Sequence, residues 1–177
     1  MTADTEIRFL DCEASGLHHT SYPIEFGWSS PDLVSSGFLI CPPMEWDLRD
    51  WRRDAELVHG ISFEGCIEHG ISVIEAAQRL NEALAGKTIH SDAPGYDSQW
   101  LRRLYSAAQI EPAFPLTLLR LEDLIRTTLR EQGHPDWWAD IDDLSRHVDA
   151  RYPRTHRAEA DARHMAAMYR SVCGLEP

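Results

Sequence analysis

The sequence lacks the features of several common classes of protein. It has no run of about 18 apolar residues, which argues against a transmembrane helix and a membrane partner. The first ten residues, MTADTEIRFL, lack the basic segment and the apolar stretch of a secretory signal. The first strand is expected to begin almost at once and leaves no room for a targeting extension. These absences predict a cytoplasmic location.

Cysteine is sparse and scattered. None of the four cysteines forms a pair with CxxC spacing, so neither a zinc knuckle nor a redox pair is indicated. Without an export signal, we expect the thiols to be reduced. Cys12 lies between two acidic residues on an expected strand. Its side chain should point to the opposite face from theirs and pack in the core.

Basic residues are few compared with acidic ones. The chain has 17 Lys and Arg against 29 Asp and Glu, which gives a formal net charge of −12 at pH 7. Tight electrostatic binding to duplex DNA normally requires clustered basic side chains. A short single-stranded substrate, or recruitment by a partner protein, fits this charge better than a long DNA track.

The order of predicted elements favours a single α/β domain over residues 1–177. The predicted strands are 6–11, 24–30, 33–40 and 87–91, with 116–121 as a further strand or its approach. The predicted helices are 55–60, 72–85, 96–108, 122–132, 141–150 and 155–173. Early antiparallel hairpins followed by parallel crossovers indicate a mixed β-sheet flanked by α-helices.

An acidic pair ends the first predicted strand. Asp11 and Glu13, in FLDCEASGL, are two residues apart, so both side chains point to one face and can approach one metal cluster. The following Ala14-Ser15-Gly16-Leu17 is small and turn-prone, so its backbone can come close to the end of a substrate. Most DxE pairs are ordinary surface residues, and this segment alone does not identify a metal site.

Two later segments carry further candidates. Asp97, in GYDSQWL, lies at the start of a predicted helix, where it is either a ligand or an acid favoured by the helix dipole. His156 and Asp161, in HRAEADA, are expected in the first turn of the last helix and one turn later. A histidine at such a position can take a proton from water, although each residue alone is also typical of a helix start.

Together the three segments resemble the motifs of the DEDDh subgroup of the DnaQ-like 3′–5′ exonuclease family, which has an RNase H-like fold. FLDCEASGL resembles the first motif, GYDSQWL the second and HRAEADA the third, and ELVHGIS, residues 56–62, resembles a segment between the first two. The resemblance extends from residue 6 to about residue 172. It implies that His156 is the general base and that the metal ligands are Asp11, Glu13, Asp97 and Asp161.

The resemblance also implies a reaction. Two Mg²⁺ or Mn²⁺ ions would bridge the scissile phosphate at the 3′ end of single-stranded DNA or RNA, and the product would be a nucleoside 5′-monophosphate. Backbone groups from Ala14 to Leu17 would contact the terminal sugar. Leu17 would be either a hydrophobic wedge beside the terminal base or a core residue. Many relatives are dimers, which leaves a homodimer or a protein partner open.

The second motif departs from the family pattern. Many relatives have a His-Asn pair shortly before the aspartate, whereas here Asp92 falls where a histidine is common. We interpret Asp92 as a structural residue such as a helix N-cap, with a spare metal ligand as the alternative. His18 and His19 are interpreted as polar loop residues, with contact to a phosphate or base near the site as the alternative. An aromatic cluster could stack on bases, pack in the protein or contact a partner, and its members are Trp46, Trp51, Trp137 and Trp138.

Three functions are compatible with this pattern. The first is a metal-dependent 3′–5′ exonuclease that acts on single-stranded ends. The second is a binding or partner-interaction module that kept the fold and lost activity, although all five catalytic positions are filled. The third is a phosphodiesterase for a small nucleotide or linker. The sequence does not distinguish DNA from RNA, because sugar discrimination depends on contacts that it does not place.

Overall fold

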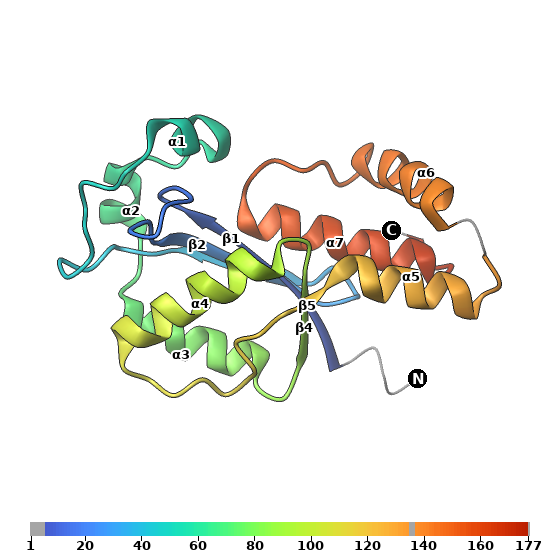
Figure 1. Cartoon of the computed structure of the whole chain (residues 1–177), viewed down its shortest axis with the longest axis horizontal. Coiled ribbons are helices and arrows are strands. Elements are labelled where there is room, and N and C mark those ends of the chain that lie inside the picture. Colours follow the sequence, from blue (N-terminus) through green and yellow to red (C-terminus); the bar gives the residue numbers. More distant parts are fainter. Residues whose placement is uncertain (1–5, 135–136, 177) are drawn as a thin grey trace.

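The computed structural model describes residues 6–134 and 137–176, with side chains for residues 6–134 and 143–176 (Figure 1). Its elements in chain order are β1 (Ile7–Ala14), β2 (Pro23–Ser29), β3 (Ser35–Leu39), α1 (Arg53–His59), α2 (Phe63–His69), α3 (Val73–Leu84), β4 (Thr88–Ser91), α4 (Pro94–Ala108), β5 (Leu119–Arg120), α5 (Leu121–Glu131), α6 (Trp137–Asp149) and α7 (Ala158–Val172). Within these described residues, every helix is too short or too polar to cross a membrane.

The strands form one mixed sheet in the order β3-β2-β1-β4-β5. β1 pairs antiparallel with β2, and β2 pairs antiparallel with β3. β4 lies parallel to β1 on its other side, and the two-residue β5 lies parallel to β4. Parallel neighbours require long crossover connections, and here the segment containing α4 links β4 to β5. The mixed sheet flanked by helices that the sequence predicts is confirmed.

Alternation along β1 divides the core into two clusters. Leu10 is fully buried in a cluster with residues of α3 and α4, and Phe9 is fully buried in a second cluster with residues of α5 and α7. Figure 1 shows these two helix pairs on opposite sides of the sheet. Asp11 and Glu13 share the strand face of Phe9 and therefore face α7. Cys12 packs with the cluster of Leu10, as predicted.

Several predicted boundaries are wrong, and the reasons differ. β1 does not end at residue 11, since pairing with β2 continues it to Ala14. α4 begins at Pro94, which suits the first helical position because it has no N–H to leave unpaired. α7 begins at Ala158, so His156 precedes the helix and does not lie in its first turn. The sequence analysis also missed the seven-residue α2.

The first turn of α7 lies against β2 at Gly27. A Cβ at this position would be 2.1 Å from the Glu159 nitrogen and 2.2 Å from the Ala158 carbonyl carbon. Ala158 and Ala162 are fully buried four residues apart on α7, and their small side chains allow this close approach. Because Gly27 is the register partner of Asp11, the close approach brings the start of α7 next to the acidic pair on β1.

Replacement of Gly27 by alanine should therefore displace the first turn of α7. We expect Gly27→Ala to lower the free energy of unfolding by about 1–3 kcal/mol, as overpacking does in other cores, measured by urea denaturation. Gly95→Ala is the matched control, because a Cβ in this first turn of α4 meets no atom within 4 Å. It should leave stability unchanged or raise it by about 0.4–1 kcal/mol. Equal stability of the two variants would contradict this account.

Candidate functional site

All five predicted site residues converge near the carboxyl ends of β1 and β4. Glu13, His156 and Asp161 each place one potential ligand atom within 4.8 Å of the others, and a second such group comprises Asp11, Asp92 and Asp97. The two groups lie next to each other, and the charges of carboxylates from both raise the pKa of Asp11. The structure therefore brings together three segments that are far apart in the sequence. It adds Asp92 to them.

Strand geometry positions Asp11 and Glu13. Both side chains project from β1 toward α7, and the register with β2 shifts between Glu13 and Ala14. The shift leaves Ile24 of β2 as the extra residue, and such irregularities are common beside active sites. β1 ends at Ala14, directly after the acidic pair, and the chain then leaves the sheet.

Asp97 lies in the first turn of α4 and is 2% exposed. Its Oδ2 accepts a hydrogen bond from the hydroxyl of Ser91, the buried last residue of β4. The same hydroxyl accepts a hydrogen bond from the Ala93 N–H at 3.0 Å. Ser91 therefore fixes both the turn into α4 and the direction of the Asp97 carboxylate, a role that the sequence analysis missed.

Asp161 lies in the first turn of α7 and is also buried. Its Oδ1 accepts a hydrogen bond from the Thr155 N–H at 2.9 Å. This bond ties the segment before α7 to the helix itself. The next residue, His156, is exposed and has a φ of 54°, a left-handed conformation that is uncommon for residues other than glycine. The histidine is therefore presented on a tight turn beside the acidic cluster.

Burial and mutual repulsion raise the pKa values of Asp11, Glu13 and Asp97. Burial is the largest cause for Asp11, followed by the charges of Asp97 and Glu13, and its pKa lies well above the ordinary value. Burial likewise raises the pKa of Asp97, against the hydrogen bond from Ser91. Burial raises the pKa of Glu13 to about 8, with a further contribution from Asp161. The cluster thus carries more negative charge than its surroundings compensate.

The donor set fits hard divalent cations. Carboxylate oxygens are the preferred protein ligands of Mg²⁺, and Mn²⁺ accepts carboxylates together with imidazole nitrogen. Two groups of ligand atoms share one acidic cluster, which matches the requirement of a two-cation site. The raised pKa values also favour a cation site, because a bound cation would relieve the repulsion between carboxylates that contributes to them.

A cavity of about 300 Å³ adjoins the cluster. The carboxylates of Asp11, Glu13 and Asp97 line one part of it, and apolar side chains from other segments line the rest. Leu17 and Tyr96 belong to the apolar part and are 71% and 51% exposed. The alternative that Leu17 is a core residue is therefore wrong. The site combines an acidic wall with an open apolar rim.

The segment after Glu13 is held rigidly beside this cavity. The Ser15 N–H donates to the Tyr22 carbonyl at 2.8 Å, and the Ser15 carbonyl accepts from the Arg52 N–H at 2.9 Å. Gly16 is enclosed, because a Cβ there would lie 2.4 Å from Arg52 Cγ. Ala14 and Gly16 line the cavity, whereas Ser15 is buried behind it. The backbone can therefore approach a ligand closely at this turn.

His59 is a cavity residue to which the sequence analysis gave no role. It ends α1, is 5% exposed, and lines the cavity together with Val58. Its Nδ1 accepts a hydrogen bond from the Ile61 N–H at 3.0 Å, so the neutral ring carries its proton on Nε2. Burial lowers the pKa of His59, which keeps the ring neutral. The ELVHGIS segment was the only sequence signal for this residue.

Asp92 and the tryptophans differ from some expectations. Ala93, not Asp92, occupies the N-cap position of α4, and Asp92 forms an ion pair with Arg154.

Trp46 is buried and stacks on Tyr22 with ring centroids 5.2 Å apart, which indicates packing. His18 and His19 are exposed loop residues, as predicted. Half-buried Trp51 donates from Nε1 to Glu56 at 2.6 Å, and the side chains of Trp137 and Trp138 lie outside the described residues.

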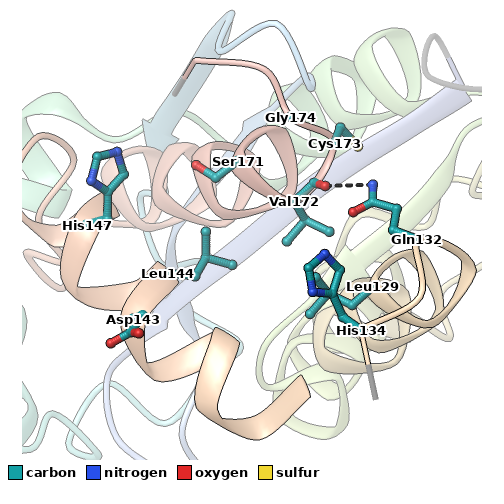
Figure 2. Close-up of a pocket in the computed structure, with 10 residues that line it drawn as sticks. All are labelled: Leu129, Gln132, His134, Asp143, Leu144, His147, Ser171, Val172, Cys173 and Gly174. Carbon is teal, nitrogen blue, oxygen red and sulfur yellow. Dashed lines mark hydrogen bonds between the residues drawn. The ribbon is translucent and has the colours of Figure 1, made fainter. Parts of the chain in front are cut away.

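A larger cavity, of about 610 Å³, lies among α5, α6 and α7 (Figure 2). Figure 2 shows Leu129 and Leu144 among its apolar residues and the hydrogen bond from Gln132 to the Val172 carbonyl, 2.8 Å long. None of the five predicted site residues lines this cavity. Its size alone does not indicate chemistry, so the smaller cavity beside the carboxylates is the candidate site.

Comparisons with known proteins identify the fold. No family model matches the chain, and no curated protein matches it. Among solved structures, Escherichia coli exonuclease I in complex with a dA16 oligonucleotide is 19% identical, with a TM-score of 0.67 over 97% of this chain and 41% of that chain. Its zinc-bound complex with single-stranded DNA is 18% identical, with a TM-score of 0.66 over 92% and 39%.

Exonuclease I from Methylocaldum szegediense gives a similar result. It is 19% identical, with a TM-score of 0.65 over 93% of this chain and 40% of that chain. This chain therefore spans about two fifths of the length of these structures. At this level of identity the likeness concerns the fold, and the RNase H-like, DnaQ-like fold predicted from the sequence is confirmed.

Proposed function

We propose that residues 1–177 form a metal-dependent 3′–5′ exonuclease domain of the DEDDh type that acts on single-stranded nucleic acid. The observation that carries the proposal is the convergence of four carboxylates and a histidine beside a cavity with an apolar rim. The shared fold supports it, because E. coli exonuclease I has been crystallised with single-stranded DNA. The products would be nucleoside 5′-monophosphates.

The acidic residues would hold two divalent cations. Glu13 on β1 and Asp161 on α7 would hold one cation, and Asp97 would hold the other. Asp11, whose pKa responds to both groups, would serve both. Bound Mg²⁺ or Mn²⁺ would stabilise negative charge on the phosphate and make a water molecule more acidic.

His156 would act as the general base. It is exposed at the edge of the cluster, near Glu13 and Asp161, where it can accept a proton from the attacking water. The water oxygen then bonds to phosphorus, and the bond from phosphorus to the 3′ oxygen of the preceding nucleotide breaks. The leaving 3′ oxygen takes a proton from solvent and becomes a hydroxyl. The imidazolium can return its proton to solvent because the ring is exposed.

The cavity would bind the terminal nucleotide. Leu17, Val58 and Tyr96 expose apolar surface beside the carboxylates, which suits stacking against a base. The fixed backbone at Ala14, Gly16 and Leu17 would contact the sugar, whereas Ser15 lies behind the cavity. Stacking is tolerant of base identity, so this arrangement favours digestion of ends over recognition of a sequence.

The first test of the proposal separates the base from the metal ligands. His156→Ala should lower kcat by roughly 10²–10⁴-fold, the usual contribution of general-base catalysis, with Mn²⁺ affinity unchanged. Asp161→Ala should lose both activity and Mn²⁺ affinity. Release of mononucleotides from 3′-labelled DNA, RNA and dinucleotides measures activity, and calorimetry measures Mn²⁺ binding. The proposal fails if no divalent metal supports release and Asp11→Ala leaves nucleic-acid binding unchanged.

A second prediction concerns pH and stability without metal. Burial holds the pKa of Glu13 at about 8, above its ordinary 4.5, so this carboxyl takes up a proton on folding. Relative to high pH, Glu13 therefore contributes most to the free energy of unfolding below pH 4.5. This contribution is lost as the pH rises through about 8. Mn²⁺ should therefore raise the Tm more at pH 8 than at pH 6, because at pH 6 it must also displace protons.

Removal of one negative charge from the cluster should raise the stability of the protein, as metal binding does. In metal-free protein, Asp11→Asn should raise the Tm by about 2–4 °C, equivalent to about 1 kcal/mol for a chain of this length, and should abolish the increase with Mn²⁺. Asp123→Asn, which removes an exposed carboxylate paired with Arg126 on α5, is the control; it should not raise the Tm of the metal-free protein and should leave the increase with Mn²⁺ unchanged. An Asp11→Asn variant less stable than the wild type would rule out repulsion as the dominant effect.

A further inference from the structure

Two arginines lie on either side of His156, and each pairs with a carboxylate on a different part of the sheet. Arg154 pairs with Asp92, directly after β4, and Arg157 pairs with Glu25 on β2. Figure 1 shows the connection after α6 running back over the sheet to the start of α7. The segment that carries His156 is thus fastened on both sides of the acidic cluster.

In the contact between Arg157 and Glu25, the carboxylate is buried, whereas the arginine side chain is 46% exposed. Glu25 is 5% exposed, and its carboxylate accepts from Arg157 Nη2 at 2.7 Å and Nε at 3.1 Å. The same carboxylate accepts from the Ala158 N–H at 2.8 Å, which satisfies the first turn of α7. Bidentate pairs of this kind are geometrically specific, so this contact fixes where the helix begins.

The contact between Arg154 and Asp92 is more open. The two side chains are 46% and 31% exposed, and Arg154 Nη2 pairs with Asp92 Oδ2. Asp92 also places a carboxylate oxygen within 4.8 Å of ligand atoms of Asp11 and Asp97. Asp92 therefore connects the acidic cluster to the segment of His156, and Arg154 offsets the additional negative charge.

The backbone alone determines where His156 lies. Within residues 6–134 and 143–176, no described hydrogen bond reaches the His156 ring, and its φ of 54° is an uncommon conformation for this residue. The preceding Thr155 is anchored through its N–H to Asp161. A small movement of residues 154–156 would therefore move the imidazole relative to the carboxylates.

We propose that Arg154 is a positioning residue for His156 and that it acts through Asp92. The inference rests on the proposed exonuclease function. The ion pair holds the N-terminal side of the segment to the turn before α4, while the pair of Arg157 and Glu25 holds its C-terminal side. Loss of the exposed pair leaves α7 capped by Glu25, so the segment loosens without unfolding of the helix.

A double-mutant cycle tests this proposal. Arg154→Met and Asp92→Asn should each lower kcat, by roughly 10- to 100-fold given the sensitivity of catalysis to small displacements. KM for the oligonucleotide and Mn²⁺ affinity should stay unchanged. The double variant should be no worse than either single variant, because both remove one contact. Arg154→Lys should recover part of the activity.

A readout that does not depend on activity accompanies the cycle. Hydrogen exchange at the Thr155 amide should be faster in metal-free Arg154→Met and Asp92→Asn than in the wild type. The matched controls are Arg146→Met and Asp143→Asn, which remove an exposed Arg–Asp pair on α6. They should leave the exchange rate of Thr155, kcat and Mn²⁺ affinity unchanged.

Other outcomes would overturn the proposal. An increase in KM for Arg154→Met alone would show that Arg154 binds the substrate. Weaker Mn²⁺ binding in Asp92→Asn alone would show that Asp92 is a metal ligand. Unchanged exchange at Thr155 in both variants would show that the pair does not order the segment, even if the wild type had no activity. Absence of wild-type activity with every divalent metal would instead reject the proposed function.

Discussion

The mutual repulsion of buried carboxylates is the constraint on which the rest of the structure depends. Asp11, Asp97 and Asp161 lie at the junction of β1, α4 and α7, and burial makes the charges of Asp11 and Asp97 costly. The fold holds them there by contacts that do not neutralise them. Ser91 directs Asp97, the Thr155 amide directs Asp161, and the lack of a side chain at Gly27 lets α7 approach β1. Holding these carboxylates together therefore lowers the free energy of unfolding of the metal-free protein.

Charge compensation around the cluster is indirect. Arg157 lies close enough to lower the pKa of Glu13, yet its hydrogen bonds go to Glu25. Arg154 is likewise bound to Asp92 and not to a residue of the proposed ligand set. Both arginines thus add positive potential near the cluster while the ligand atoms stay available. Direct ion pairs to Asp11 or Glu13 would relieve the repulsion more effectively, but they would also occupy the oxygens that a cation needs.

The parts of the fold that could be predicted from the sequence are those set by local pattern. Alternation placed Asp11 and Glu13 on one face of a strand and Cys12 on the other, because this depends only on the two-residue period. The start of α7 could not be predicted in the same way. Its first N–H is satisfied by Glu25, more than 130 positions away, so the local sequence near Thr155 gives no sign of it. The extension of β1 to Ala14 likewise depends on pairing with β2.

The same distinction applies to the candidate site. The five residues were identified because the short motifs that carry them resemble those of a known family, whereas Ser91 and His59 act through contacts that only the folded chain creates. The net charge of −12 then places a limit on how the proposed substrate binds. A phosphate near Asp11 would be repelled by the carboxylates unless cations were already present. Cation binding and binding of the terminal phosphate must then be coupled, whereas contact of a base with Leu17 and Tyr96 needs no cation. In the proposed enzyme, the apolar rim would hold the end of the strand and the cations would admit its phosphate.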